Sequence, residues 1–378
     1  MTLSIYVRIA LVLGGVCASA VSMAQTFVKP EPIFQEGRFA PGFGNEAIVT
    51  AHYTVNTEGK TEDIELAGEF SNPFVESALK ETVADWVFKP GSYNGQPSSY
   101  HNQEWVFVMR VNPNMPPMPG PGGRRGAPPK VEGCATGDNC ISENIAAAGP
   151  VPLALSADVK EGFETISTLI SAQDFDGALK EIKKVERKGL HTVFDFSLVN
   201  DLKATAYMGK KQYFEALEAT KLATISAPNV QGDIQYFLTD DILKNTLLKQ
   251  FVLATTNRQF GLAYDTYQIL VDKFDLPADE KIHEQATIIK TALDSPDPLP
   301  ALAKITDKSW SFKPSRRIFT VTDVVGSLKR IDAHCERSNL ELEYMPDVDW
   351  TLPDAFGSCT LEFEGRDDTT FTIYEFKE

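Results

Sequence analysis

A segment rich in proline and glycine, residues 113–155, divides the chain into parts that must fold separately. Between residues 112 and 133 there are seven prolines and five glycines, and almost no large apolar side chain. Such a composition cannot form a packed core and predicts an extended linker. The chain of 378 residues also exceeds the usual size of one domain. We therefore expect an α+β protein with several domains.

The part before the linker, residues 28–112, has the pattern of a small α+β unit. A β-rich run around Tyr53, a turn at Gly59 and an alternating run after it predict a hairpin. Apolar side chains then recur at helical spacing up to Trp86. Residues 105–111 are rich in aromatic and β-branched side chains and predict a strand. The expected order is strand, strand, helix, strand.

Four segments of this unit follow one another in a recognisable order: Tyr53–Ile64, Ala84–Pro90, Asn94–Pro97 and the final strand. Together they resemble the C-terminal domain of the TonB family. The resemblance implies a periplasmic domain whose sheet edge pairs with a short peptide of an outer-membrane transporter. We expect the exposed edge to be the final strand. The predicted partner-binding residues are Trp105, Val106, Phe107, Val108, Met109, Arg110 and Val111.

Residues 156–295 are expected to be helical, and the sequence repeats itself there. An aromatic residue followed three positions later by alanine occurs at Phe175, Tyr213 and Phe260. Alanine lets two helices approach closely while the aromatic ring fills the groove. The pattern resembles tetratricopeptide repeats, whose period is about 34 residues. The alanines here are 38 and 47 residues apart, which indicates diverged repeats or irregular loops. Stacks of this kind offer a concave surface to protein partners.

After a proline-containing hinge that ends at Pro300, the pattern predicts a mainly-β domain over residues 305–378. Residues 325–335 are expected to form a short helix. Apolar and polar side chains alternate in the other segments, as in strands with one buried face. The predicted strands lie around Phe312, Ile318, Leu340, Cys359 and Phe371.

The first 24 residues have the layout of a secretory signal. Arg8 precedes an apolar run from Ile9 to Ala20, and small residues lead to Ala24. We expect cleavage after Ala24 and a periplasmic protein; the alternative is an uncut anchor in the inner membrane that faces the periplasm. The net charge of −16 repels phosphate backbones and anionic lipid. This argues against nucleic-acid binding, and membrane attachment is expected only if the leader is retained.

Four cysteines would remain after cleavage, in two distant clusters. An even number in an exported chain indicates disulfides, and four cysteines allow three pairings. Local closure is the simplest choice and pairs Cys134 with Cys140 and Cys335 with Cys359. Metal binding is the alternative, but neither cluster has the C-x-x-C spacing.

The sequence contains no strong catalytic pattern. The five histidines form no H-E-x-x-H pair, and no G-x-S-x-G elbow occurs. We therefore expect no catalytic residue, no cofactor and no metal site. Acid pairs such as Asp347 with Asp349 are typical of solvated turns, although a secreted hydrolase with its site in the C-terminal domain is a further alternative.

The function predicted from the sequence is that of a non-enzymatic periplasmic binding or adaptor protein. Its first domain would dock peptide segments of envelope or outer-membrane transport proteins by strand addition, and its helical repeat would hold a second protein. The alternative from the same resemblance is a membrane-anchored energy transducer of the TonB type, acting in transport across the outer membrane.

Overall fold

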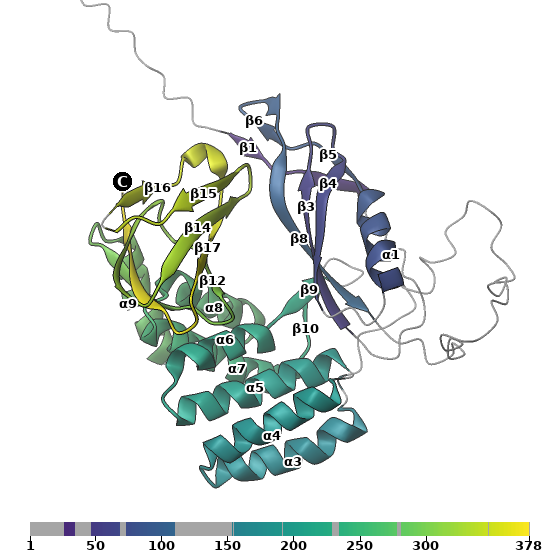
Figure 1. Cartoon of the computed structure of the whole chain (residues 1–378), viewed down its shortest axis with the longest axis vertical. Coiled ribbons are helices and arrows are strands. Elements are labelled where there is room, and N and C mark those ends of the chain that lie inside the picture. Colours follow the sequence, from purple (N-terminus) through teal and green to yellow (C-terminus); the bar gives the residue numbers. More distant parts are fainter. Residues whose placement is uncertain are drawn as a thin grey trace, which may run out of the picture.

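The computed structural model describes residues 26–34, 47–68, 73–109, 153, 155–190, 192–228, 234–277, 281–346 and 348–377. The predicted leader, nearly all of the predicted linker, and the predicted Cys134–Cys140 pair lie outside these residues. The described residues form an N-terminal unit (26–109), a helical stack (153–294) and a β unit (299–377), as Figure 1 shows.

The N-terminal unit has the predicted order of strand, strand, helix, strand. Its main sheet is antiparallel with the order β4-β3-β8. The strands are β3 (Ala47–Val55), β4 (Thr61–Ala67) and β8 (Tyr100–Met109), and the helix is α1 (Pro73–Ala84). Short strands add to this plan: β1 (Phe27–Val28), β2 (Glu31–Phe34), β5 (Val87–Lys89), β6 (Ser92–Tyr93) and β7 (Gln96–Pro97). The sequence did not reveal them because each has four residues or fewer.

Trp86 is the centre of the core of this unit. It is 1% exposed, and its ring lies 5.5 Å from Tyr53 and 5.7 Å from Phe107. Burial raises the pKa of Tyr53 to about 12. The hairpin before α1 needs its glycine, because Gly59 has a φ of +81° and a Cβ there would lie 1.9 Å from the carbonyl oxygen of Phe88.

The helical stack consists of antiparallel helix pairs. Neighbouring helices contact one another in chain order, which is the arrangement of a repeat. The helices are α3 (Ala157–Ser171), α4 (Phe175–Lys188), α5 (Val193–Gly209), α6 (Tyr213–Ala223), α7 (Asp240–Thr256), α8 (Phe260–Lys273) and α9 (Lys281–Asp294).

The sequence repeat corresponds to a repeated turn. Helices α4, α6 and α8 begin at the three aromatic residues of the repeat, and the alanine three positions later is fully buried each time. Two residues before each aromatic, the backbone adopts a positive φ of about 60°, at Gln173, Lys211 and Arg258. Three equal turns therefore reverse the chain three times in the same way.

A small hairpin explains the longer spacing of 47 residues. Strands β9 (Ser226–Pro228) and β10 (Ile234–Tyr236) are inserted between α6 and α7 and pair antiparallel. Ala227 and the adjoining Phe237 are buried against Val106 of the N-terminal unit. The irregular part of the repeat thus makes the contact between the helical stack and the N-terminal unit.

The β unit consists of two four-stranded antiparallel sheets around one apolar core. Their orders are β11-β18-β13-β16 and β12-β17-β14-β15. The rings of Phe363 and Phe371, one from each sheet, lie 5.0 Å apart. The strands are β11 (Leu299–Lys304), β12 (Ser309–Phe312), β13 (Ile318–Val325), β14 (Leu328–Cys335), β15 (Asn339–Glu343), β16 (Asp349–Thr351), β17 (Cys359–Gly365) and β18 (Thr370–Phe376), with a 3-10 turn at Asp354–Phe356.

The helix expected over residues 325–335 was wrong. Leu328, Ile331 and Cys335 have a spacing that fits a helix, but Ile331, Ala333 and Cys335 alternate inward along β14. The predicted Cys335–Cys359 disulfide is confirmed. It joins β14 to its neighbour β17, where the two cysteines are direct cross-strand partners, and does not join a helix to a strand.

Arg316 fixes the segment between α9 and β11, which the sequence had suggested as a hinge. Its guanidinium donates to the carbonyl oxygens of Ala292 and Leu293, in the last turn of α9, and to that of Ser295. It also donates to the carbonyls of Asp297 and Glu375. Since the last carbonyls of a helix have no partner within the helix, this arginine caps α9 and joins it to the β unit.

Glu375 makes the stability of the β unit depend on pH. Burial raises the pKa of its carboxyl to about 7, although the backbone N–H groups of Arg316 and Ser315 and the positive charge of Arg316 oppose the shift. The folded state therefore holds a proton that the unfolded state releases above pH 4.5. We expect the free energy of unfolding to fall by up to about 3 kcal/mol as pH rises from 4.5 to about 7. Urea titrations at several pH values should show this fall for wild type and not for Glu375→Gln. An equal dependence of the unfolding free energy on pH in the two proteins would refute the raised pKa of Glu375.

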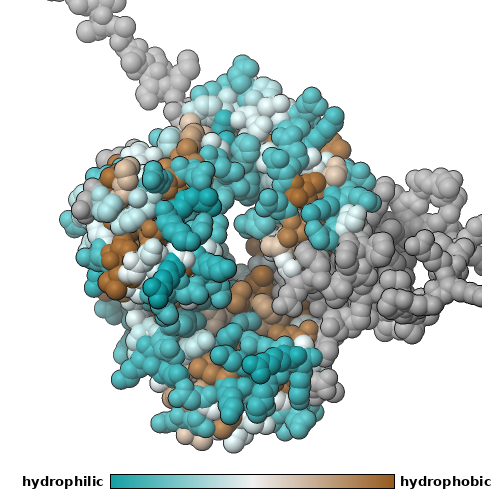
Figure 2. Space-filling view, in the orientation of Figure 1, coloured by the Kyte–Doolittle hydropathy of each residue, from teal (hydrophilic) through white to brown (hydrophobic). Residues whose placement is uncertain are grey.

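The three units surround a central opening. The N-terminal unit contacts the helical stack through Val106, and contacts the β unit through a hydrogen bond from the backbone N–H of His101. The helical stack meets the β unit where Lys304 donates to Glu215 at 2.6 Å and Trp310 donates to Glu218 at 3.2 Å. Figure 2 shows the opening between these contacts, with apolar side chains along part of its margin.

Candidate docking site at strand β8

Strand β8 is an outer strand of its sheet, and Figure 1 shows it on the side that faces the β unit across the opening. The strand begins at Tyr100, five residues before the predicted start. Edge strands leave backbone donors and acceptors available to another chain. This outer edge is therefore the candidate site for peptide binding.

The side chains of the predicted docking residues are largely used inside the protein. Phe107 is 3% exposed and packs with Trp105 around Trp86, whose ring lies 5.6 Å from Trp105. Val106 lies on the opposite face and packs against the helical stack. The backbones of Val108 and Met109 continue the strand, whereas Arg110 and Val111 lie outside the described residues. A partner at β8 would consequently pair with the backbone more than with these side chains.

The beginning of β8 is contacted by a turn of the β unit. The turn, residues 336–338, connects β14 to β15. The backbone N–H of His101 donates to the carbonyl of Glu336 at 2.6 Å. The side-chain amide of Asn102 donates to the carbonyl of Cys335 and to Asn339, both at 2.7 Å. One end of the edge is thus closed by the protein itself, while β9 contacts the strand farther along.

Arg337, at the tip of that turn, enters an aromatic pocket of the N-terminal unit. Its guanidinium lies 4.2 Å from the ring centroid of Tyr93, 5.1 Å from Phe27 and 5.8 Å from Tyr100. It also donates to the hydroxyl of Ser98 at 2.7 Å. A guanidinium over aromatic faces is a cation–π arrangement. No periodicity or spacing in the sequence predicts that these residues meet.

Between these two contacts, β8 carries one exposed carboxylate, that of Glu104. Glu104 on β8 and Glu65 on β4 are both direct cross-strand partners of His52 on β3, so they lie on one face at opposite edges of the sheet. Both are exposed, and Glu104 lies 3.5 Å from the His52 ring. Of the two, only Glu104 lies at the edge that faces the opening, where it makes the edge locally acidic.

The facing wall, formed by β14 and its neighbours, is acidic as well. Its outer face carries a set of carboxylates, which are Asp332, Glu341, Glu343, Glu362 and Glu364. Arg330 lies 2.9 Å from Asp332 and 2.9 Å from Glu341, and these contacts raise its pKa. Burial raises the pKa of Asp332, against the effect of Arg330. The carboxylates exceed the cations on this face, so it favours cationic groups.

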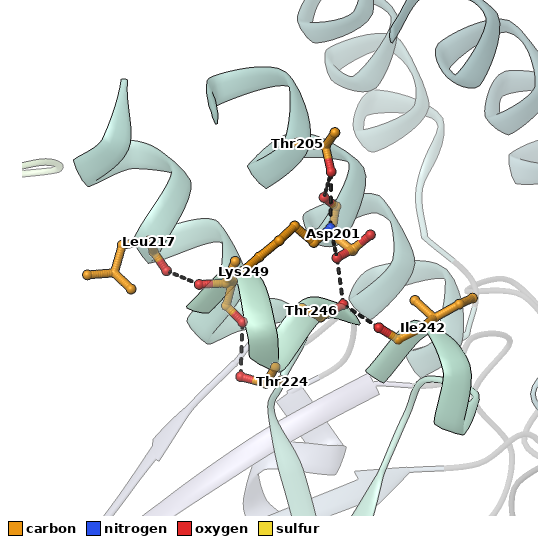
Figure 3. Close-up of polar contacts among 8 residues, drawn as sticks. Asp201, Thr205, Leu217, Thr224, Ile242, Thr246 and Lys249 are labelled. Atoms are coloured by element: carbon orange, nitrogen blue, oxygen red, sulfur yellow. Dashed lines mark hydrogen bonds and ion pairs between the residues drawn. The ribbon is translucent and has the colours of Figure 1, made fainter. Parts of the chain in front are cut away.

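A buried polar network lies within the helical stack, away from β8 (Figure 3). Asp201 of α5 accepts hydrogen bonds from Thr246 and Lys249 of α7, and Lys249 also donates to Thr205 at 3.1 Å. The carboxylate and the ammonium are paired with each other, so neither is available as a nucleophile or base. The network therefore joins α5 to α7.

Of the acidic pair Asp347 and Asp349, the structure describes only Asp349. Asp349 is an exposed residue of β16. The described residues contain no group of three or more histidine, cysteine or acidic side chains that could hold a metal ion. Nor does this part of the chain contain a helix with the length and apolarity to cross a membrane.

Comparisons with known proteins give little further information. No family model matches the chain, and no curated protein matches it. Among solved structures, the TPR domain of Sgt2 from Aspergillus fumigatus is similar to 39% of this chain over 85% of its own, with 12% identity and a TM-score of 0.29. A structural similarity this low supports no conclusion about fold or function. The description of the helix pairs and of the edge strand depends only on the geometry given above.

Proposed function

We propose that this protein is a non-catalytic binding protein of the periplasm that docks extended peptides on the edge of β8. The observation that carries the proposal is the position of β8, an outer strand whose edge faces an opening large enough to be seen through the molecule (Figure 2). An extended peptide can add to such an edge by main-chain hydrogen bonds. The strand order of the unit also supports the resemblance to the TonB C-terminal domain.

Two further features support an adaptor role. The Cys335–Cys359 disulfide supports an oxidising compartment such as the periplasm. The helical stack, with its repeated turns, supports a tetratricopeptide-like surface for a second protein. On this proposal the first partner is a peptide segment of an envelope or outer-membrane transport protein.

The acidic edge gives a test with a matched control. We expect a cationic peptide from an outer-membrane transporter to bind wild type, and Glu104→Lys to weaken its affinity about ten-fold, because one charge at the docking edge is reversed. Glu65→Lys makes the same change beside His52 but at the other edge, and should weaken affinity less than two-fold. Isothermal titration calorimetry at low salt measures both.

Hydrogen exchange locates the peptide. Bound peptide should slow exchange of the amides at Gln103–Val106 and leave those of β4 unchanged. Absence of binding at millimolar peptide, or equal effects of the two lysine variants, would remove the proposal.

A further inference from the structure

We propose that the turn Glu336–Ser338 is an intramolecular ligand of the aromatic pocket beside β8, and that a peptide presenting an arginine is the external partner that competes with it. The inference rests on the proposed docking at β8. The inference names the turn as the element that regulates access to the edge, and arginine as the side chain that the neighbouring pocket prefers.

The pocket has the chemistry of a guanidinium site. Phe27 comes from β1, Tyr93 from β6 and Tyr100 from the start of β8, and Ser98 supplies a hydrogen-bond acceptor. A planar guanidinium stacks on aromatic faces while its edge donates hydrogen bonds. Arg337 uses both properties, and it belongs to another unit of the chain. The pocket is therefore a recognition site between two units, and the guanidinium of Arg337 shows which chemical group the pocket binds.

The turn also imitates an added strand. The backbone N–H of His101 donates to Glu336, which is the bond that a peptide added at this edge would accept. The side-chain amide of Asn102 donates to the preceding carbonyl, that of Cys335. The turn thus occupies one end of the same edge that the proposed function assigns to a partner.

The turn can leave the pocket without unfolding. Its shape is held within the β unit, by the Cys335–Cys359 disulfide and by hydrogen bonds from Glu336 to Ser358 and from Arg337 to Phe356. None of these bonds involves the N-terminal unit. Separation of the two units would therefore expose the pocket and leave the turn intact.

The internal contact is not fully satisfied, which leaves room for a competitor. Among the described residues, the buried Nε and Nη1 atoms of Arg337 and the buried hydroxyl of Tyr100 have no hydrogen-bond partner. The pair between Lys29 and Glu336 spans 2.7 Å, but the lysine side chain is 71% exposed and adds little. A partner that brings an acceptor beside its arginine would satisfy these groups better. The acidic walls of the opening would attract it.

The test uses the full chain and two labelled peptides. One copies residues 333–341 with serine in place of Cys335, and the other carries Arg337→Ala in addition. We expect the first peptide to bind the Arg337→Ala chain at least about ten-fold more tightly than wild type, because the internal competitor is weakened. The second peptide should bind neither chain. Fluorescence anisotropy measures both.

Controls separate competition from misfolding. Arg366→Ala removes an exposed arginine of the same unit and should leave peptide affinity at the wild-type value. Arg337→Lys retains a cation and should give a smaller gain than Arg337→Ala. In the alanine variant the amide of His101 should exchange faster, while the amides of β17 keep their protection. Loss of protection in β17 would show a damaged fold. The comparison with wild type would then use Arg337→Lys, which should still bind the arginine peptide more tightly than wild type does.

Three results would overturn the inference. They are equal affinity of the arginine peptide for wild type and for Arg337→Ala, equal affinity of the two peptides, and no binding of the arginine peptide to the Arg337→Ala chain. If the transporter peptide still depends on Glu104 in any of these cases, docking at β8 stands and only the inference fails. If the transporter peptide does not bind either, the proposed function fails as well.

Discussion

Replacing Trp86 with alanine is expected to unfold the N-terminal unit and leave the rest of the described chain folded. The side chain is 1% exposed, and three aromatic rings lie within 5.7 Å of it. Removing a buried tryptophan costs about 3–5 kcal/mol. A unit this small has a total stability of about 5 kcal/mol, so the loss removes most of it.

Hydrogen exchange with mass spectrometry measures the result unit by unit. In Trp86→Ala the amides of β3 and β8 should lose protection, and those of α5 and β17 should keep it. Val87→Ala is the matched control, since this neighbour is 41% exposed and should change stability by less than about 0.5 kcal/mol. Protected β3 amides in Trp86→Ala, or unfolding of all three units together, would contradict the expectation.

Replacing Arg316 with alanine should separate the helical stack from the β unit. The side chain is 8% exposed, and its loss leaves the last carbonyls of α9 unpaired and Glu375 without its neighbouring positive charge. Leaving several buried polar groups unsatisfied costs about 3–5 kcal/mol. Arg316→Lys should recover only a small part, because an ammonium cannot reach carbonyls on several sides at once.

Urea unfolding followed by two probes measures this effect. Wild type should unfold with the end of α9 and the β unit together, whereas Arg316→Ala should show a separate and earlier transition for α9. Arg317→Ala is the control: its side chain pairs with Asp354 and donates to the carbonyls of Pro353 and Gly357, all within the β unit, so its loss should not produce a separate transition for α9. Coincident transitions in Arg316→Ala would show that other contacts hold the two units together.

The local structure was largely predictable because short-range patterns determine it. The turn at Gly59, the helix starts at Phe175, Tyr213 and Phe260, and the Cys335–Cys359 pair all follow from residues close in sequence or from the chemistry of one residue type. The strand at residues 328–335 was missed because its apolar positions fit both helical and strand spacing. Pairing with β15 and β17 decided between the two.

The contacts between units were not predictable in the same way. Arg337 meets Tyr93 across 244 positions of the chain, and neither residue belongs to a pattern that signals the other. Val106 has the spacing of an ordinary strand residue, yet it packs on a hairpin inserted into the helical repeat. Such long-range pairs are brought together by tertiary packing. The sequence alone shows that an arginine and several aromatic residues are present, but not that they are in contact.

Because the three units form a closed ring, their arrangement affects the rates at which a ligand associates and dissociates. A flexible peptide end can thread into the central hole directly. A loop whose two ends are both attached to folded domains cannot, and must wait until one joint of the ring separates. Residence times would then be governed by the rate at which that joint opens, so two ligands of equal affinity could differ greatly in exchange rate according to whether they have a free end.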